Sequence, residues 1–235
     1  MSTSTQEEIV AKGTAAPAAA APAPAPPAVP DELRERAAKT SAELLAKVRE
    51  GRQMDLDRRL AARQSAAEPR LGEPIVDTYV AFDLYAYSPI QFIGPPPYQP
   101  SRIIAAGEWA VIYAVLFVNP TVDIPHGFAV PPTVQLGGRT YRVNLEQVNL
   151  TNVTDGPDDF RQAVFTSPAP DYTLLDFWFQ APDPGPTKPR VMEANLTADI
   201  LNMAQPYAAF ATTIVDVDQW KVLEDIPMRY LIYRK

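Results

Sequence analysis

The sequence offers few side chains that could act as a nucleophile or a general base. His126 is the single histidine, and it stands between a proline and a glycine, which places it in a loop. The serines after residue 70 are Ser88, Ser101 and Ser167, and none stands in a Gly-x-Ser-x-Gly turn. The chain has no cysteine, so thiolate nucleophiles, thiolate metal sites and disulfides are excluded. The sequence therefore does not predict a hydrolytic triad.

Clustered carboxylates leave one metal chemistry open, because Ca²⁺ needs only oxygen ligands. Three aspartates share one turn, and two more alternate on one face of a strand end. If these two places meet in the fold, they would form a calcium site; otherwise they are solvated acids. The candidate ligands are Asp155, Asp158, Asp159, Asp216 and Asp218.

Aromatic residues and carboxylates could also bind or cleave a carbohydrate. Trp109, Trp178 and Trp220 could stack on sugar rings, and a pair of acidic residues could act as general acid and base. The alternation in 176–179 and 217–220 is more typical of the core and edge of a sheet. A carbohydrate-binding or carbohydrate-cleaving β-sandwich is thus the first alternative function, and a calcium-responsive sandwich is the second.

A series of strands over 71–235 would position these residues. Ile75 to Tyr87 alternates apolar and polar residues and is rich in aromatic and β-branched types, which predicts a half-buried strand. Trp109 to Val118 is apolar on both faces, which predicts a strand that is central or covered on both sides. Further strands are predicted at 133–136 and 140–148 (a hairpin across Gly137 and Gly138), 160–166, 173–180, 191–198, 208–217 and 228–233.

Many short strands separated by turn residues indicate an all-β fold, with an antiparallel β-sandwich or a jelly-roll-like domain as the expected architecture. The 26 prolines against 10 glycines fit a fold with many chain reversals. Leu196 to Met203 lacks clean alternation and could instead form a short helix.

The first 70 residues have a different character. Residues 1–30 form an Ala/Pro-rich arm with little to bury, which predicts a disordered, semi-extended tether. The arm either carries a docking peptide at a distance from the domain or has no partner. We expect three parts: this arm, a charged helical segment over 31–68, and a β-sandwich domain over 71–235 that folds independently.

The helical segment should begin near Asp31, bend or break at Gly51 and end before Pro69. Its apolar stripe is narrow and its other faces are highly charged, which suits a helix that lies on a protein partner, self-associates, or packs on its own domain. The residues predicted to make the partner contact are Leu33, Leu44, Val48, Leu56 and Leu60.

The acidic balance is concentrated in the expected domain, where ten Lys and Arg face eighteen Asp and Glu, so nucleic-acid binding is not expected. The N-terminus has no basic stretch followed by an apolar one, and the apolar run from 110 to 118 is far shorter than the ~20 residues of a membrane-spanning helix. We therefore expect a cytoplasmic or otherwise intracellular protein.

Pro95 to Tyr98 matches the Pro-Pro-x-Tyr ligand of proline-binding domains, but we favour a rigid loop between strands, because the surrounding domain is rich in proline throughout. The leading hypothesis is a non-catalytic structural or adaptor protein without a cofactor. In it the β-sandwich supplies a rigid surface and edge strands, and the helix and arm mediate contact with a protein partner or a second copy in a homo-oligomer.

Overall fold

The computed structural model describes residues 28–65, 82–120, 130–186, 188–201, 207–216, 221–223 and 227–235. At 56, 58–65, 207 and 223 it describes the backbone alone. Several predictions therefore lie outside the described part of the chain: those for the arm over 1–27, the loop at His126, the end of the helix at Pro69, and the side chains of Asp218 and Trp220.

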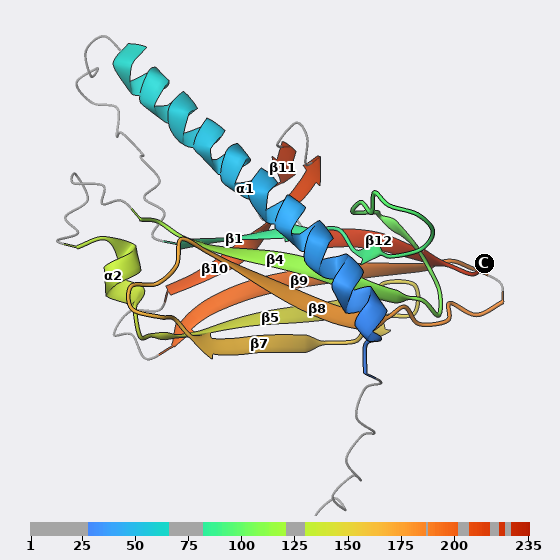
Figure 1. The fold of residues 1–235 in the computed structure, drawn as a ribbon. Coiled ribbons are helices and arrows are strands. Elements are labelled where there is room, and N and C mark those ends of the chain that lie inside the picture. Colours follow the sequence, from blue (N-terminus) through green and yellow to red (C-terminus); the bar gives the residue numbers. More distant parts are fainter. Residues whose placement is uncertain are drawn as a thin grey trace, which may run out of the picture.

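One long helix precedes a series of strands (Figure 1). In chain order the elements are α1 (Asp31–Ser65), β1 (Phe82–Tyr87), β2 (Ile90–Gln91), β3 (Ile103–Ala105), β4 (Trp109–Val118), α2 (Pro132–Leu136), β5 (Thr140–Asn149), β6 (Thr154–Asp155), β7 (Asp159–Val164), β8 (Tyr172–Gln180), β9 (Arg190–Leu201), β10 (Tyr207–Asp216), β11 (Lys221–Leu223) and β12 (Met228–Tyr233).

The strands form two layers that are joined through β10. The first layer, sheet A, has the order β8-β4-β1-β10-β11, with β2 continuing along β4 beyond β1. In the second, sheet B, β5 pairs with β9 and carries β6 and β7 on its other side, while β12 and β3 extend the sheet beyond β9. Residues 207–210 of β10 pair with β9, and residues 211–214 pair with β1. The all-β prediction is confirmed.

The pairing is antiparallel except at two places. β1 runs parallel to β10, and β12 runs parallel to β3. The sheet is therefore mixed, and the antiparallel pairing expected from the sequence holds for the described strand pairs other than these two. The parallel pairs join strands far apart in the sequence, and no local pattern marks them.

β4 packs against a neighbouring layer on each of its two faces. Its even-numbered residues, Ala110 to Val118, face sheet B within the main core, where they meet Val143, Leu145, Leu196 and Ile200 among others. Its odd-numbered residues face the opposite way, and those from Val111 to Phe117 belong to a second buried cluster with α1. The prediction that this strand is covered on both faces is confirmed.

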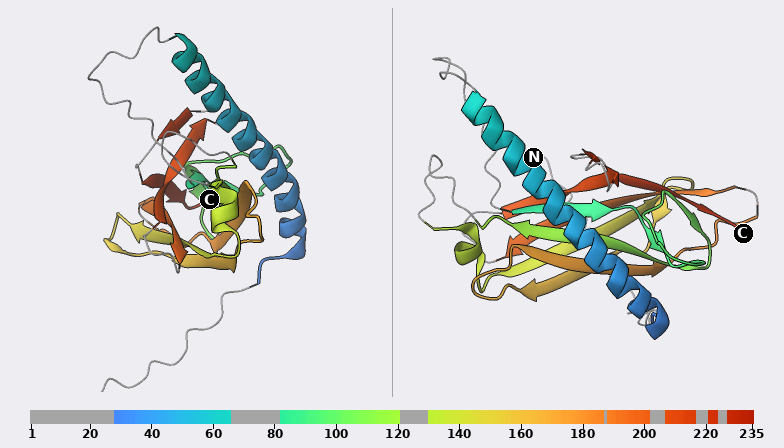
Figure 2. Two further views of the ribbon diagram at one scale, coloured as in Figure 1. Left: turned by 90° about the vertical axis from the view of Figure 1, so that its left-hand side faces the viewer. Right: turned by 45° about the horizontal axis from the view of Figure 1, so that its top comes forward.

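α1 forms a third layer on the outer face of sheet A. Ala37, Leu44 and Val48 are buried against Tyr85, Tyr87, Val111, Tyr113, Val115 and Phe117. Figure 2 shows the helix crossing this sheet diagonally, with its C-terminal turns projecting past it. The helical segment and the sandwich thus share a core.

Two local predictions about helices were wrong. The strand expected at 133–136 is instead the five-residue helix α2, and no hairpin forms there. Pro132 occupies the first turn, where its fixed φ suits a helix and its missing N–H costs nothing. Of the break or bend expected at Gly51, the break is also absent, since α1 runs through this buried glycine without interruption. An interior glycine costs about 1 kcal/mol, which packing on sheet A offsets.

The alternative helix at 196–203 is not formed either, because residues 196–201 belong to β9. Their side chains alternate between the core and the outer face of sheet B. The outward-facing residues of this stretch, Thr197, Asp199 and Leu201, are half-exposed, and the apolar Leu201 at an outward position is where the alternation fails.

Candidate functional site

A groove of about 650 Å³ runs along one end of β8, and we call it the β8 groove. Three parts of the chain build it: the start of α1, the paired strands β4 and β8, and the turn that leads into β7. Its lining residues are Ala28, Val29, Arg34, Trp109, Pro157, Asp158, Asp159, Arg161, Asp176, Trp178, Phe179 and Gln180.

Two tryptophans form the aromatic part of the β8 groove. Trp109 and Trp178 are both half-buried, and Trp178 packs against the cluster under α1. The indole N–H of Trp178 donates to Asp176 Oδ2 at 2.7 Å, and its ring lies 5.8 Å from that of Phe92. These contacts fix the orientation of Trp178, so that this wall of the groove is preorganised.

The charged residues of the groove are paired with groups of the same chain. Arg161 forms an ion pair with Asp159 at 2.6 Å, and its guanidinium lies 5.0 Å from the centre of the Phe177 ring. Asp158 Oδ1 accepts the backbone N–H of Gln147 at 2.7 Å. These carboxylates therefore hold the turn before β7 in place.

β8 presents a free edge to this groove. Among the described residues it pairs with β4 alone, in a register from Trp109–Gln180 to Phe117–Tyr172. Two backbone hydrogen bonds lie just beyond the two ends of this pairing: Val118 N–H donates to Asp171 O, and Ala181 N–H donates to Glu108 O. They show which of the alternating residues of β8 direct their backbone groups to β4. Odd-numbered residues of β8 thus bond to β4. The N–H and C=O groups of the even-numbered residues point away from the sheet.

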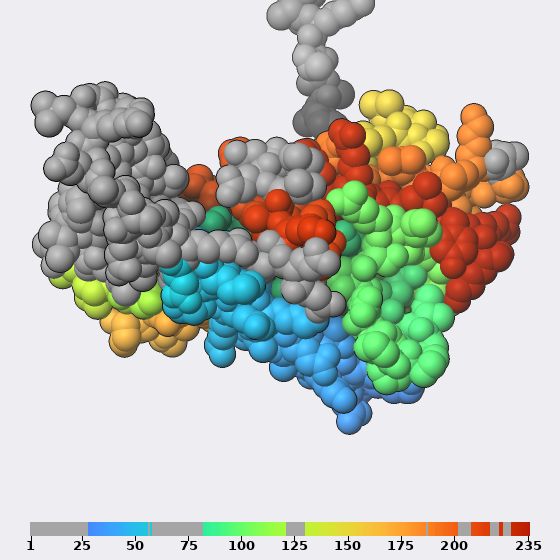
Figure 3. Space-filling model, turned by 90° about the horizontal axis from the view of Figure 1, so that it is seen from above, coloured from blue at the N-terminus to red at the C-terminus, as the bar shows by residue number. Residues whose placement is uncertain are grey.

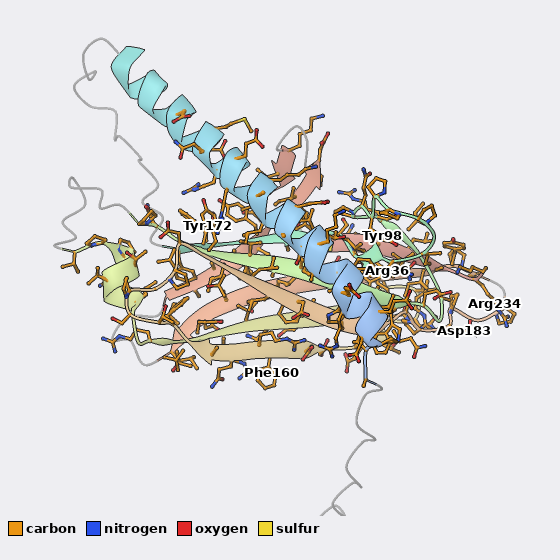
Figure 4. All side chains as sticks on the ribbon, viewed as in Figure 1. Arg36, Tyr98, Phe160, Tyr172, Asp183 and Arg234 are labelled. Atoms are coloured by element: carbon orange, nitrogen blue, oxygen red, sulfur yellow. The ribbon has the colours of Figure 1, made fainter. Side chains whose placement is uncertain are left out.

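The neighbouring edge strand, β7, is protected differently. Its outward-facing residue Phe160 has both backbone groups occupied: the N–H donates to Asp159 Oδ1 at 2.8 Å, and the C=O accepts from Arg161 at 2.9 Å. Figure 4 shows the Phe160 side chain at the lower border of the sandwich. Such local capping blocks the addition of another strand at this residue. Within the described residues, no comparable side-chain bond covers the even-numbered backbone groups of β8.

The residues predicted to contact a partner lie mainly on the chain's own sheet A. Leu44 is 5% exposed, Val48 is fully buried, and Leu33 is half-buried against the same cluster. The side chains of Leu56 and Leu60 lie outside the described part. A partner could reach Leu44 and Val48 only if α1 left the sheet.

The Pro95–Tyr98 segment packs on α1. Tyr98 donates its hydroxyl to Gly94 O at 3.0 Å, its ring meets Phe92 edge-on at 5.0 Å, and Arg36 reaches its oxygen at 3.5 Å (Figure 4). Figure 3 shows this green loop against the blue half of the helix. These contacts support the interpretation as a rigid loop, because a proline-binding domain would need Tyr98 free.

The structure does not bring the predicted calcium ligands together. Asp155, Asp158 and Asp159 lie on or beside β6 and β7 in sheet B, whereas Asp216 ends β10 beside β11 and pairs with Lys221 at 3.7 Å. Asp218 is outside the described residues. In the part of the chain that the structure describes, no three acidic, histidine or cysteine side chains are close enough to hold a metal ion.

Unlike the predicted calcium ligands, residues predicted to bind a carbohydrate do lie together. The β8 groove is lined by two of the three tryptophans and by Asp158, Asp159 and Asp176. Sequence reasoning named these residues but not their meeting place. It also missed the free edge of β8 and the position of Val29 and Arg34 beside it. Strand pairing and helix docking join distant segments, so no local pattern signals them.

Comparison with known proteins identifies no family. No protein-family model matches the chain, and no curated protein resembles it. Among the solved structures that match is the CARDB domain of the PF1109 protein from Pyrococcus furiosus in complex with di-metal ions, which aligns with 72% of this chain and 99% of its own. The identity is 11% and the TM-score 0.27, so we draw nothing from this likeness. Neither described helix is long and apolar enough to cross a membrane.

Proposed function

We propose that the protein is a non-catalytic assembly module that associates with a second copy of itself through the free edge of β8. The observation that carries this proposal is the row of outward-facing backbone groups on β8, at residues 172, 174, 176, 178 and 180, which lies beside a preorganised aromatic groove. Addition of a strand to such an edge is a common way for β proteins to bind an extended segment.

The contrast between the two edge strands supports this choice. β7 carries the Asp159–Phe160–Arg161 cap, which discourages strand addition at Phe160. β8 is nine residues long and has an apolar and aromatic outer face under α1. Because α1 anchors that face, the edge is held rigidly, and a bound strand would lose less order on the receiving side.

A charged residue on β8 tests the proposal. Leu174 is half-buried on this strand, opposite Val115, and packs at the margin of the cluster under α1. In Leu174→Lys the long side chain would carry its ammonium group out to the strand edge, which disfavours pairing with another strand. Leu174→Met keeps the position apolar and is the matched control.

The measurement is the molar mass of the full chain by light scattering after size-exclusion chromatography. We expect the wild-type chain and Leu174→Met at a multiple of 25.8 kDa, and Leu174→Lys at 25.8 kDa with an unchanged circular dichroism spectrum. A wild-type monomer at every concentration, or a Leu174→Lys protein with the wild-type mass, would overturn the proposal.

Carbohydrate binding is a second candidate, favoured by the meeting of Trp109, Trp178 and three carboxylates in the β8 groove. Trp109 provides an aromatic surface on which a sugar ring could stack. A glycan array with the full chain distinguishes the two functions. Saturable binding that disappears in Trp109→Ala supports a sugar site, and an array without signal removes this candidate.

A further inference from the structure

We infer that the segment received by β8 is the Ala/Pro-rich arm of a second copy, residues 18–26, added as an extra strand in the β8 groove. This inference rests on the proposed function, because it identifies the segment that the free edge receives. Three features carry it: the spacing of the prolines in the arm, the place where the arm joins the described structure, and the handedness of the fold.

The spacing of the prolines suits one-sided strand pairing. Over residues 18–26 the prolines occupy only even positions, at Pro22, Pro24 and Pro26. In a strand, alternate residues direct their N–H and C=O groups to the same side. The odd-numbered alanines can therefore bond to β8, while the prolines, which have no N–H, face outward.

The length of this stretch is limited by prolines of the opposite parity. Pro17 and Pro27 occupy odd positions, so each would place a residue without an N–H against β8. The stretch between them has nine residues, the same length as β8. One arm therefore matches the whole edge.

The arm is also preorganised for this role. Ala21, Ala23 and Ala25 each precede a proline, which restricts them to extended conformations. Pairing consequently orders a chain that already has few alternatives, and the entropy cost is smaller than for an ordinary segment. Residues 18–26 carry no charged side chain, so their docking in the β8 groove buries no unpaired charge.

The arm joins the structure at the site it is inferred to occupy. Ala28 and Val29 line the β8 groove beside Gln180. Only Pro27 separates Ala28 from the inferred strand. An arm that crosses to a second copy therefore brings the two grooves close together, and two copies could exchange arms across a twofold axis.

Handedness decides between the arm of the same chain and that of a second copy. β1 and β8 are both antiparallel to β4, so they run in the same direction, from left to right in Figure 1. In that view α1 lies in front of sheet A, and β8 lies on the opposite side of β4 from β1. A strand of the same chain that reaches Ala28 along β8 would continue through α1 to β1.

In the view of Figure 1, this connection would lead from an arm strand below β8, through α1 in front of the sheet, to β1 above β4. It would be a left-handed crossover. About 98% of crossovers between parallel strands of one sheet are right-handed. An arm from a second copy makes no such connection within the sheet it joins. We therefore assign the strand to the second copy.

Two triple variants of the full chain test the inference. Ala21→Pro with Ala23→Pro and Ala25→Pro removes the N–H groups that would face β8. Pro22→Val with Pro24→Val and Pro26→Val changes the outward-facing positions instead, keeps a preference for extended conformations and is the matched control. Both keep the length and charge of the arm and leave the described core untouched, so neither should impair folding.

We expect the first variant to dissociate to a monomer at a concentration where the wild-type chain is associated, and the second to keep the wild-type mass in light scattering. An unchanged mass in the first variant would exclude the arm as the added strand. If Leu174→Lys still dissociated the protein, the proposed function would nevertheless stand. Equal dissociation of both variants would overturn the inferred strand register.

Discussion

The hydroxyl of Tyr87, on β1 in sheet A, donates a hydrogen bond of 3.0 Å to the carbonyl oxygen of Leu44 on α1. Tyr113 on β4 makes the equivalent bond of 3.1 Å to Ala37. Ala37 and Leu44 are two turns apart on the same face of the helix. The two tyrosines thus attach α1 to the sheet in a buried interface, and the helix is part of the folded unit.

Removal of either hydroxyl should weaken this attachment. Tyr87→Phe and Tyr113→Phe keep the ring, so we expect each to lower the free energy of unfolding by about 1 kcal/mol through the lost hydrogen bond. Urea denaturation measures the loss. Tyr233→Phe, at a residue 40% exposed, is the control and should leave stability unchanged. Equal stability of all three variants and the wild type would show that these bonds do not hold the helix.

Alkaline pH should destabilise the fold through its buried tyrosines. Burial raises the pKa of Tyr85, Tyr87, Tyr113 and Tyr230 above the ordinary value of 10.0. Because the folded pKa exceeds the unfolded one, the stabilisation is fully present below about pH 10 and is lost as the pH rises toward the folded pKa. Urea midpoints measured from pH 8 to pH 11 should be constant at first and then fall. Constant midpoints up to pH 11 would contradict this prediction.

Gly156 should tolerate no side chain. An added Cβ would lie 2.8 Å from Gln147 Cβ and 2.9 Å from its carbonyl oxygen, where Gly156 N–H already donates. Gln147 cannot yield, because its buried amide donates to Pro157 O and accepts from the Tyr230 hydroxyl. We expect Gly156→Ala to cost about 1 to 3 kcal/mol in a denaturation experiment. The exposed neighbour Asp155→Ala should be neutral, and equal stability of both variants would refute the close packing.

Deletion of the helix should damage the domain. The packing of α1 on sheet A predicts that a chain without residues 1–70 exposes large side chains of the second cluster, including Tyr87, Tyr113 and Phe117. We expect this truncated protein to bind a hydrophobic dye and to unfold without a sharp transition, whereas a chain without residues 1–27 keeps α1 and should still unfold in a sharp transition. A sharp, unshifted transition after the longer deletion would restore residues 71–235 as an independent domain.

The sequence correctly predicted those elements whose burial follows from the local pattern of apolar and polar residues. Trp109 to Val118 is apolar at every position, and β4 is buried on both faces. The stripe of Leu33, Leu44 and Val48 indicated one buried helix face, but the same stripe suits a partner and the chain's own sheet. Only the three-dimensional arrangement shows that sheet A covers it.

The sequence failed where a local signal was weak or a pairing was long-range. Thr133 to Leu136 has strand-forming residues, yet Pro132 starts a helical turn instead. The free edge of β8 depends on which strands lie beside it, and β4 pairs with it from more than 50 positions away in sequence. The β8 groove adds residues from α1 and from the turn before β7, so its composition follows from tertiary packing.

Residue-resolved amide hydrogen exchange of the full chain, at a dilute and a concentrated condition, would locate the contact between copies. If β8 receives a strand, the amides of Leu174, Asp176 and Trp178 should exchange at least about tenfold more slowly in the concentrated sample. The amides of Gln162 and Val164 on β7 should keep their rates. Unchanged rates at β8, or slowing at β7 instead, would contradict assembly through the β8 edge.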